Sequence, residues 1–144
     1  MPTSGNYPGD YEPQGAIVIQ TKKTGAAIAK GDLCTLSSGS FRTAPAGATT
    51  GPFGVATKAA TAADTTVQLL IQGIVYMTAS NVITVNNVIT GSTGTAGQVE
   101  QSATPASSTI CGWYLAHENE GDGVTVPTDT VNGDVIRVRF GVVY

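Results

Sequence analysis

The sequence has little charge, few aromatic residues and a single histidine. Charged residues make up 12% of the 144 positions and aromatic residues 6%. Ordinary soluble domains carry about 25% charged residues, so this composition excludes a disordered polyelectrolyte and a charged helical bundle. The surface must therefore be built largely from Thr, Ser, Gln, Asn and Gly, and the core from Val, Ile, Leu and Ala.

Clusters of basic residues and long apolar runs are also missing. The seven Lys and Arg residues are scattered, Lys22-Lys23 is the one adjacent pair, and the formal net charge is −3. We therefore expect no nucleic-acid partner, because such binding requires a basic patch. No apolar run approaches the roughly 20 residues that cross a bilayer, so we expect no membrane partner. The first ten residues lack the basic and apolar regions of a signal peptide, which favours an intracellular origin.

The sequence lacks the residue combinations that catalytic sites require. A hydrolytic triad needs a base beside its nucleophile, and the one histidine is His117. No Gly-X-Ser-X-Gly elbow is present. The glycine-rich run 91–97 is not followed by Lys-Ser/Thr, so it is no phosphate-binding loop. We predict that the protein is not an enzyme and binds no cofactor and no small-molecule substrate.

Two features leave alternatives open. The cysteines, Cys34 and Cys111, are interpreted as buried reduced thiols, although a disulfide would form if their Cα atoms lay within about 7 Å. The run 117–123 is acidic and contains glycine, which suits Ca²⁺, but its spacing does not match an EF-hand loop. We favour a solvated hairpin end whose charges keep a β edge soluble, with no metal.

What the sequence does contain is a period of two near its end. Ile136, Val138 and Phe140 would point to one side of an extended chain, and Arg137 and Arg139 to the other. This alternation is typical of a half-buried β-strand. The two arginines could bind a partner's carboxylates, although an exposed strand face is the favoured interpretation for a monomer.

Short runs rich in β-branched residues, separated by Gly and Pro, predict further strands along the chain. They cover residues 16–20, 33–36, 41–44, 53–58, 65–77, 81–85, 88–90, 98–101, 109–116 and 134–144, with a helical turn at 26–30. The second and third of these runs should form a hairpin. No stretch shows helical periodicity over three turns. The sequence therefore predicts an all-β fold, a small β-barrel or β-tulip-like domain over residues 15–144.

Two parts of the sequence resemble each other. Gly73-Ile-Val-Tyr76 matches Gly141-Val-Val-Tyr144, and each follows a long alternating run. Phe53-Gly54 and Cys111-Gly112 stand at the corresponding earlier positions. This repetition favours two related β units in one domain, with chance similarity in a chain rich in Val, Thr and Gly as the rival explanation.

The first 14 residues form a different kind of segment. Prolines such as Pro8 and Pro13 disfavour a helix and favour extended backbone, so we expect an N-terminal arm over residues 1–14. Tyr7 and Tyr11 are its large apolar groups. Disordered arms usually carry few aromatics, so these two side chains should dock. The sequence leaves open whether they pack on their own domain or on a partner.

Several short motifs are similar to phage head proteins. The segments Asp10–Gly15, Gly51–Ala60 and Asp64–Gly73 resemble the arm end, the first core strand and the following long strand of lambda-type phage head decoration proteins. Lys30-Gly-Asp-Leu33 resembles related small β proteins of phage head gene clusters. Together the resemblance covers roughly residues 10–80.

This resemblance implies a structural role in a virion. Members of that family are homotrimers on the outer surface of the mature, expanded capsid, where they clamp neighbouring major capsid protein subunits. The implied localisation is the virion, after synthesis in the host cytoplasm, and the implied partners are the major capsid protein and further copies of this chain. The arm residues implied to contact the capsid are Tyr7, Pro8, Tyr11, Pro13 and Gln14.

Two alternative functions remain at this point. One is the base domain of a capsid fibre. The other is a carbohydrate-binding β module, which would need exposed aromatic side chains. Trp113 and Tyr114 are adjacent on an expected strand, so we predict that one lies in the core and the other at the surface.

Overall fold

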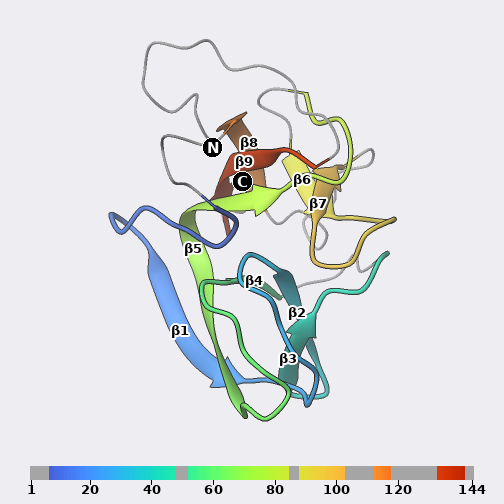
Figure 1. The fold of residues 1–144 in the computed structure, drawn as a ribbon. Helices are drawn as coiled ribbons and strands as arrows, with labels where there is room; N and C mark the ends of the chain where they lie inside the picture. The colour runs from blue at the N-terminus through green and yellow to red at the C-terminus, as the bar shows by residue number, and fades with distance from the viewer. Residues whose placement is uncertain (1–6, 48–51, 85–87, 103–111, 118–132, 142–144) are drawn as a thin grey trace.

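The computed structural model describes residues 7–47, 52–84, 88–102, 112–117 and 133–141, and in them the fold is all-β, as predicted. The strands are β1 (Ile17–Lys22), β2 (Leu33–Ser37), β3 (Ser40–Thr43), β4 (Phe53–Ala56), β5 (Thr66–Thr78), β6 (Val88–Gly91), β7 (Val99–Gln101), β8 (Gly112–His117) and β9 (Val135–Phe140). They join in one nine-stranded sheet that curls into a half-barrel (Figure 1).

The sheet consists of two units with the same topology. The first unit has the order β3-β2-β4-β5 and the second the order β7-β6-β8-β9, and the units meet where β5 pairs with β9. Gly73 and Gly141, which the sequence comparison aligned, both have a positive φ, 130° and 77°. The predicted pair of related β units is therefore confirmed in the topology, while residues 142–144 lie outside the described residues.

β5 is the strand that joins the two units. Its first half pairs with β1 and β4, and its second half pairs with β9, so it runs from the lower to the upper part of the molecule in Figure 1. Residues from both halves, such as Leu70 and Met77, are fully buried in one hydrophobic core. The length of this strand therefore fixes how the two units sit against each other.

The alternation in β9 has the predicted orientation. Ile136, Val138 and Phe140 are at most 1% exposed, while Arg139 is exposed. The three apolar side chains belong to the larger core cluster, which contains residues of both units. A smaller cluster lies within the first unit and comprises Ile28, Cys34, Phe41, Ala56, Ala60, Val67 and Leu69.

The predicted hairpin forms between β2 and β3. Ser37 pairs with Ser40, which leaves a two-residue turn. The turn residues Ser38 and Gly39 have φ values of 51° and 81°. Two positive φ values in a two-residue turn match the right-handed twist of the flanking strands, so this Ser-Gly sequence favours the hairpin.

Two local predictions were wrong. Residues 26–30 form no helical turn, because Ile28 exchanges two backbone hydrogen bonds with Ala60, at 2.9 and 2.8 Å, in an isolated bridge. Residues 81–84 form no strand, because the side chain of Asn81 accepts a hydrogen bond from the N–H of Val82 at 2.8 Å. Such local capture of a backbone N–H competes with ladder formation.

Of the two cysteines, the structure describes Cys34. Cys34 is fully buried in β2, and its thiol is free. Burial, with the charge of Asp32 as a smaller contribution, raises the pKa of Cys34 to about 12, so the thiol stays protonated and behaves as a small hydrophobic group. Cys111 and residues 118–123 of the acidic loop lie outside the described residues.

Candidate functional site: the N-terminal arm segment

The described part of the arm, residues 7–14, lies on the protein's own sheet. Residues 9–12 run antiparallel to the second half of β5, with an isolated bridge between Tyr11 and Val75. The backbone hydrogen bonds run from Gly9 N to Tyr76 O (2.8 Å), from Tyr76 N to Asp10 O (2.9 Å) and from Glu12 N to Ile74 O (2.9 Å). We call residues 7–14 the arm segment; its middle acts as a short additional strand.

An ion pair fastens the arm segment to the last strand. Glu12 accepts hydrogen bonds from Arg137, with Nε to Oε2 at 2.6 Å and Nη2 to Oε1 at 3.0 Å. This bidentate geometry is the strong form of an arginine–carboxylate contact. The Glu12 hydrogen bond raises the pKa of Arg137 against the effect of burial. The sequence offered a partner's carboxylates or an exposed strand face for Arg137, and in the structure Arg137 instead binds Glu12 of its own chain.

Tyr76 lies beside this ion pair, opposite Arg137 in the β5–β9 ladder. Its side chain is 7% exposed. Burial raises the pKa of Tyr76, and the negative charge of Glu12 raises it further, while Arg137 opposes both effects. The phenol therefore remains neutral, and the local charge is the balanced pair of Glu12 and Arg137.

A second ion pair holds the other end of the arm segment. Asp10 accepts a hydrogen bond from Lys30 Nζ at 2.5 Å and another from the N–H of Tyr7 at 2.8 Å. Burial acts to raise the pKa of Asp10, but the hydrogen bonds from Lys30 and Tyr7 outweigh it, and the net pKa is lowered. Lys30 lies just before β2, so the arm segment is bonded to both units.

Close backbone packing surrounds these polar contacts. A Cβ on Gly31 would lie 2.4 Å from Pro8 Cβ, and one on Gly9 would lie 2.8 Å from Ala56 O. Gly9 and Gly31 both have a φ of 92°, a region that residues with a side chain rarely adopt. The arm segment therefore sits where two glycines let its backbone approach the β1–β2 connection.

After the arm segment the chain turns and continues into β1, which pairs with the preceding part of β5 from Gln72 back to Thr66. Residues 13–16 form a turn, closed by a hydrogen bond from Ala16 N to Pro13 O at 3.3 Å. A Cβ on Gly73 would lie 3.0 Å from Ala16 Cα, so the absence of a side chain at Gly73 makes room for the turn. The arm segment thus contacts β5 after Gly73, and β1 contacts β5 before it.

The five arm residues predicted to contact a capsid lie together at this surface. Tyr7 and Tyr11 are 49% and 38% exposed, so much of both rings faces solvent. Pro8 is half-buried, while Pro13 and Gln14 are exposed in the turn. The sequence left open whether the tyrosines pack on their own domain or on a partner. In the structure the backbone around Tyr11 pairs with β5 of the same domain. Capsid contact by these side chains stays a prediction.

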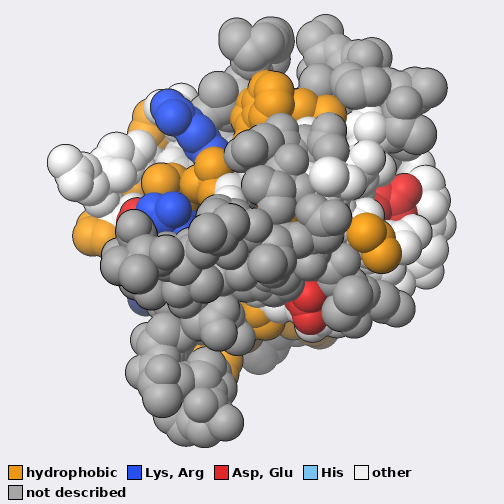
Figure 2. Space-filling model, turned by 90° about the horizontal axis from the view of Figure 1, so that it is seen from above, with side chains coloured by type: hydrophobic (Ala, Val, Ile, Leu, Met, Phe, Trp, Pro, Cys, Tyr) orange, Lys and Arg blue, Asp and Glu red, His pale blue; other side chains and the backbone are white. Residues whose placement is uncertain are grey.

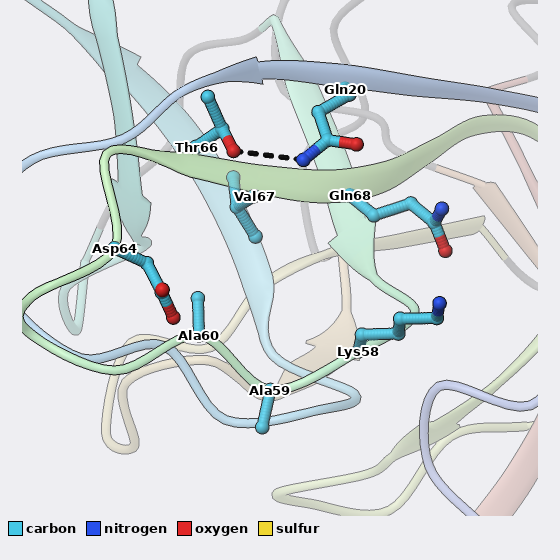
Figure 3. Close-up of a pocket in the computed structure, with 8 residues that line it drawn as sticks. All are labelled: Gln20, Lys58, Ala59, Ala60, Asp64, Thr66, Val67 and Gln68. Atoms are coloured by element: carbon cyan, nitrogen blue, oxygen red, sulfur yellow. Dashed lines mark hydrogen bonds between the residues drawn. The ribbon is translucent and has the colours of Figure 1, made fainter.

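A polar groove borders the arm segment. One part, of about 430 Å³, is lined by Gly9, Asp10, Tyr11, Lys30, Thr57, Lys58 and Gln68. A second part, of about 220 Å³, shares Lys58 and Gln68 and continues past Thr66 to Asp64 (Figure 3). In that figure the Lys58 and Gln68 side chains extend alongside each other, and Gln20 donates a hydrogen bond to Thr66 at 2.8 Å.

Charge is sparse on the surface of the described residues. Figure 2 shows Lys, Arg, Asp and Glu side chains scattered among hydrophobic and uncharged groups on one face, with no continuous basic or acidic area in the coloured part. Among the residues that the structure describes, no group of three or more His, Cys, Asp and Glu side chains could hold a metal ion. The same residues include no helix long and apolar enough to cross a membrane.

A solved structure shares this fold. It is the N base of the head fiber gp8.5 of bacteriophage phi29, with a TM-score of 0.57 and 15% sequence identity. The likeness covers 87% of this chain and 93% of that chain. No protein-family model matches the sequence, and no curated protein matches it. At this identity, the likeness shows the fold, and it shows it over nearly the whole length of both chains.

The Asp10–Lys30 contact predicts how stability depends on pH. The pKa of Asp10 lies below its ordinary value of 3.8 in the folded protein. The stabilisation is therefore fully present above pH 3.8 and is lost as the pH falls through the lowered pKa. We expect an Asp10→Asn variant to be less stable than the wild type at pH 7, with the difference shrinking below pH 3.8.

Urea unfolding of both proteins across this pH range measures the effect. Asp64→Asn is a suitable comparison, because Asp64 also accepts local hydrogen bonds, from Thr61, but contacts no part of the arm segment. A stability difference for Asp10→Asn that grew on acidification would contradict the assignment of the stabilising contact.

Proposed function

We propose that this protein is a structural component of a phage head, and that it binds the outside of the mature capsid as a base-like domain. The observation that carries the proposal is the fold shared with the head fiber N base of phi29 over 87% of this chain. The motifs at residues 10–80 that resemble lambda-type decoration proteins point independently to the same part of a virion. The proposed partner is the major capsid protein, and the proposed location is the outer capsid surface.

The finer proposal is a homotrimer that clamps neighbouring capsid subunits. A domain with low charge and many Thr and Ser residues can pack at high density on a shell with little mutual repulsion. Three linked copies would hold three arm segments near the shell at high effective concentration, so weak individual contacts would add to firm binding. The role requires no catalysis and no cofactor.

The arm segment is the proposed contact surface. Its backbone is held by β5, by Glu12–Arg137 and by Asp10–Lys30, whereas the rings of Tyr7 and Tyr11 face outwards. Aromatic side chains presented by rigid backbone lose little entropy on binding and contribute strongly to interfaces. A contact made this way keeps the domain intact and uses the arm as a fixed platform.

Co-sedimentation with capsids tests the proposal. The wild-type protein should pellet with expanded capsids of its own phage and remain in the supernatant with isolated coat subunits. Replacing Tyr7 and Tyr11 together by Ser should weaken capsid binding at least about tenfold, as expected for loss of aromatic interface contacts. Absence of wild-type binding at saturating concentration would overturn the proposed function.

A matched variant separates the arm from general surface effects. Leu36 is 41% exposed on β2, away from the arm segment, so Leu36→Ser removes a comparable exposed apolar group. This variant should bind capsids like the wild type. A deletion of residues 1–13 would be a poorer test, because it also removes three backbone hydrogen bonds to β5 and the partner of Arg137.

The carbohydrate-binding alternative depends on exposed aromatic groups. Tyr114 is fully buried and Trp113 is half-buried opposite Arg139, so the predicted division between core and surface is confirmed for this pair. A glycan screen of the wild type and of a Trp113→Ala variant examines this alternative. Specific glycan binding that Trp113→Ala abolishes, together with no capsid binding, would favour it over the capsid role.

A further inference from the structure

β1 has a backbone edge that the rest of the described chain does not use. β1 pairs with β5, in the register Ile19–Leu69 and Thr21–Val67. The same register continues to Lys23, whose N–H donates to Thr65 O at 3.1 Å. In an antiparallel ladder, every second residue directs its backbone N–H and C=O groups at the partner strand, and the residues between direct theirs away from it. Residues 19, 21 and 23 therefore face β5, and Val18, Gln20 and Lys22 direct their N–H and C=O groups to the opposite edge.

Thr24 is the next residue whose backbone groups point away from β5, and it shows that this edge can pair with another strand. Thr24 N donates to Phe41 O in β3 at 2.9 Å. The parallel bridge between Lys23 and Phe41 takes up this edge at Lys22, and before it β1 and β3 form no ladder. The part of the outer edge that the described residues leave without a backbone partner therefore runs over Val18 and Gln20. β1 lies at the side of the molecule with β5 as its neighbour (Figure 1).

The sequence of β1 gives this edge little protection. Natural sheets blunt their edges with charge, proline, bulges or short strands. The charge of Lys22 and the register shift between Ile17 and Val18 protect the two ends of this edge. Residues 18–21 between them carry neither charge nor proline, and β1 is longer than β3 or β7 at the two ends of the sheet. Ile17 is 45% exposed and adds an apolar contact at the start of the strand. The edge therefore has the properties of a site for strand addition.

We propose that the outer edge of β1 receives an extended segment of the major capsid protein as an added strand. This inference rests on the proposed function and names a contact on the domain itself, separate from the tyrosines of the arm segment. The occupant has a backbone free to pair with Val18 and Gln20, and an apolar side chain against Ile17.

The size of the edge favours a capsid segment over a second copy of this chain. Stable interfaces between two proteins bury at least about 1,200 Å². Edge-to-edge pairing of two six-residue strands covers much less than that, so it would not hold a dimer by itself. A strand from the shell needs no such area, because the arm segment and neighbouring copies contribute binding at the same time.

One substitution removes the outer edge while sparing the inner one. Gln20→Pro deletes an N–H that faces away from β5, and proline is tolerated on edge strands in that orientation. The matched control is Gln20→Thr, which also loses the 2.8 Å side-chain hydrogen bond to Thr66 but keeps the backbone N–H. Both variants are first compared with the wild type by circular dichroism and thermal unfolding.

Binding to expanded capsids is then measured by co-sedimentation, with solution mass measured in parallel. We expect Gln20→Thr to bind like the wild type and Gln20→Pro to bind at least tenfold more weakly. Equal binding by both variants would overturn the β1 inference and leave the proposed function standing, whereas no binding by the wild type would overturn both. A change of solution mass in Gln20→Pro without a change in capsid binding would assign the edge to a second copy instead.

A second variant decides the question if Gln20→Pro fails to fold. Ile17→Lys places a charge at the exposed start of the edge, and Val82→Lys, at a side chain that is 54% exposed elsewhere, is its control. Ile17→Lys should weaken capsid binding and Val82→Lys should not. Equal binding by these two variants would likewise overturn the β1 inference.

Discussion

Replacing Phe140 by Ala is expected to destabilise the protein by about 3–5 kcal/mol, the usual range for truncating a buried phenylalanine. Phe140 is 1% exposed in the larger core cluster. It also stands opposite Gly73 in β5 and Gly112 in β8, so neither neighbouring strand has a side chain at that position. The paired positions in β5 and β8 therefore offer no side chain to fill the space that Ala would leave.

Chemical denaturation measures this loss. Arg139→Ala is the matched control, because Arg139 is the preceding residue of the same strand and its side chain is exposed. Its effect should stay within about 0.5 kcal/mol. Since domains of this size are stable by only about 5–15 kcal/mol, Phe140→Ala should lower the melting temperature markedly. A loss below about 1 kcal/mol would contradict the placement of Phe140 in the core.

Replacing Gly31 by Ala is expected to displace the arm segment. The new Cβ would lie 2.4 Å from Pro8 Cβ and 2.7 Å from Pro8 C, and Gly31 has a φ of 92°. Backbone strain and overpacking together should cost roughly 2–5 kcal/mol. Hydrogen exchange should show the local consequence, because the N–H groups of Gly9 and Glu12 are bonded to β5 when the arm segment is seated.

Gly39→Ala separates the two causes. Gly39 has a similar φ of 81°, but a Cβ there would meet nothing within 4 Å. It should therefore show only the conformational cost, about 1–2 kcal/mol, with the protection of Gly9 and Glu12 unchanged. If Gly31→Ala behaved like Gly39→Ala in both measurements, the close contact between the arm segment and the β1–β2 connection would be refuted.

Most of the strands could be predicted from the sequence because their signals are local. The alternation at residues 136–140 and the run of β5, which is rich in Val, Ile and Leu, mark strands without any knowledge of their partners. The repeated Gly-Ile/Val-Val-Tyr motif also indicated the two units, which share one pairing order in the structure. Residues 81–84 failed because an asparagine side chain captured a backbone N–H, an effect that composition does not show.

The position of the arm segment on the domain could not be predicted, because its contacts join distant parts of the chain. Glu12 and Arg137 carry no pattern that relates them, yet they form a bidentate ion pair. The buried Lys23 is a similar case, since its ammonium donates to the carbonyls of Thr24 and Asp64 at 2.7 and 2.9 Å. The glycines at positions 9, 31 and 73 were the available signal, because each permits a close backbone approach.

The described part of the arm is bonded to its own domain, whereas the sequence suggested an extension that reaches for a partner. From Gly9 onwards it is part of the sheet, and its exposed tyrosines are presented from a fixed backbone. The proposal keeps the expected partner, the capsid. It places the contact on the exposed tyrosines of an arm segment that is fixed beside β5. The edge of β1 that the described residues leave unpaired at Val18 and Gln20 is the second surface that we propose, on the strand that directly follows the arm.

Electron cryomicroscopy of expanded capsids saturated with the protein tests the capsid role most directly. The account predicts added density on the outer surface, at three-fold and quasi-three-fold positions, into which the half-barrel fits with the arm segment against the shell. Capsids that show no added density at a large molar excess of folded protein, or density on the inner surface, would contradict it.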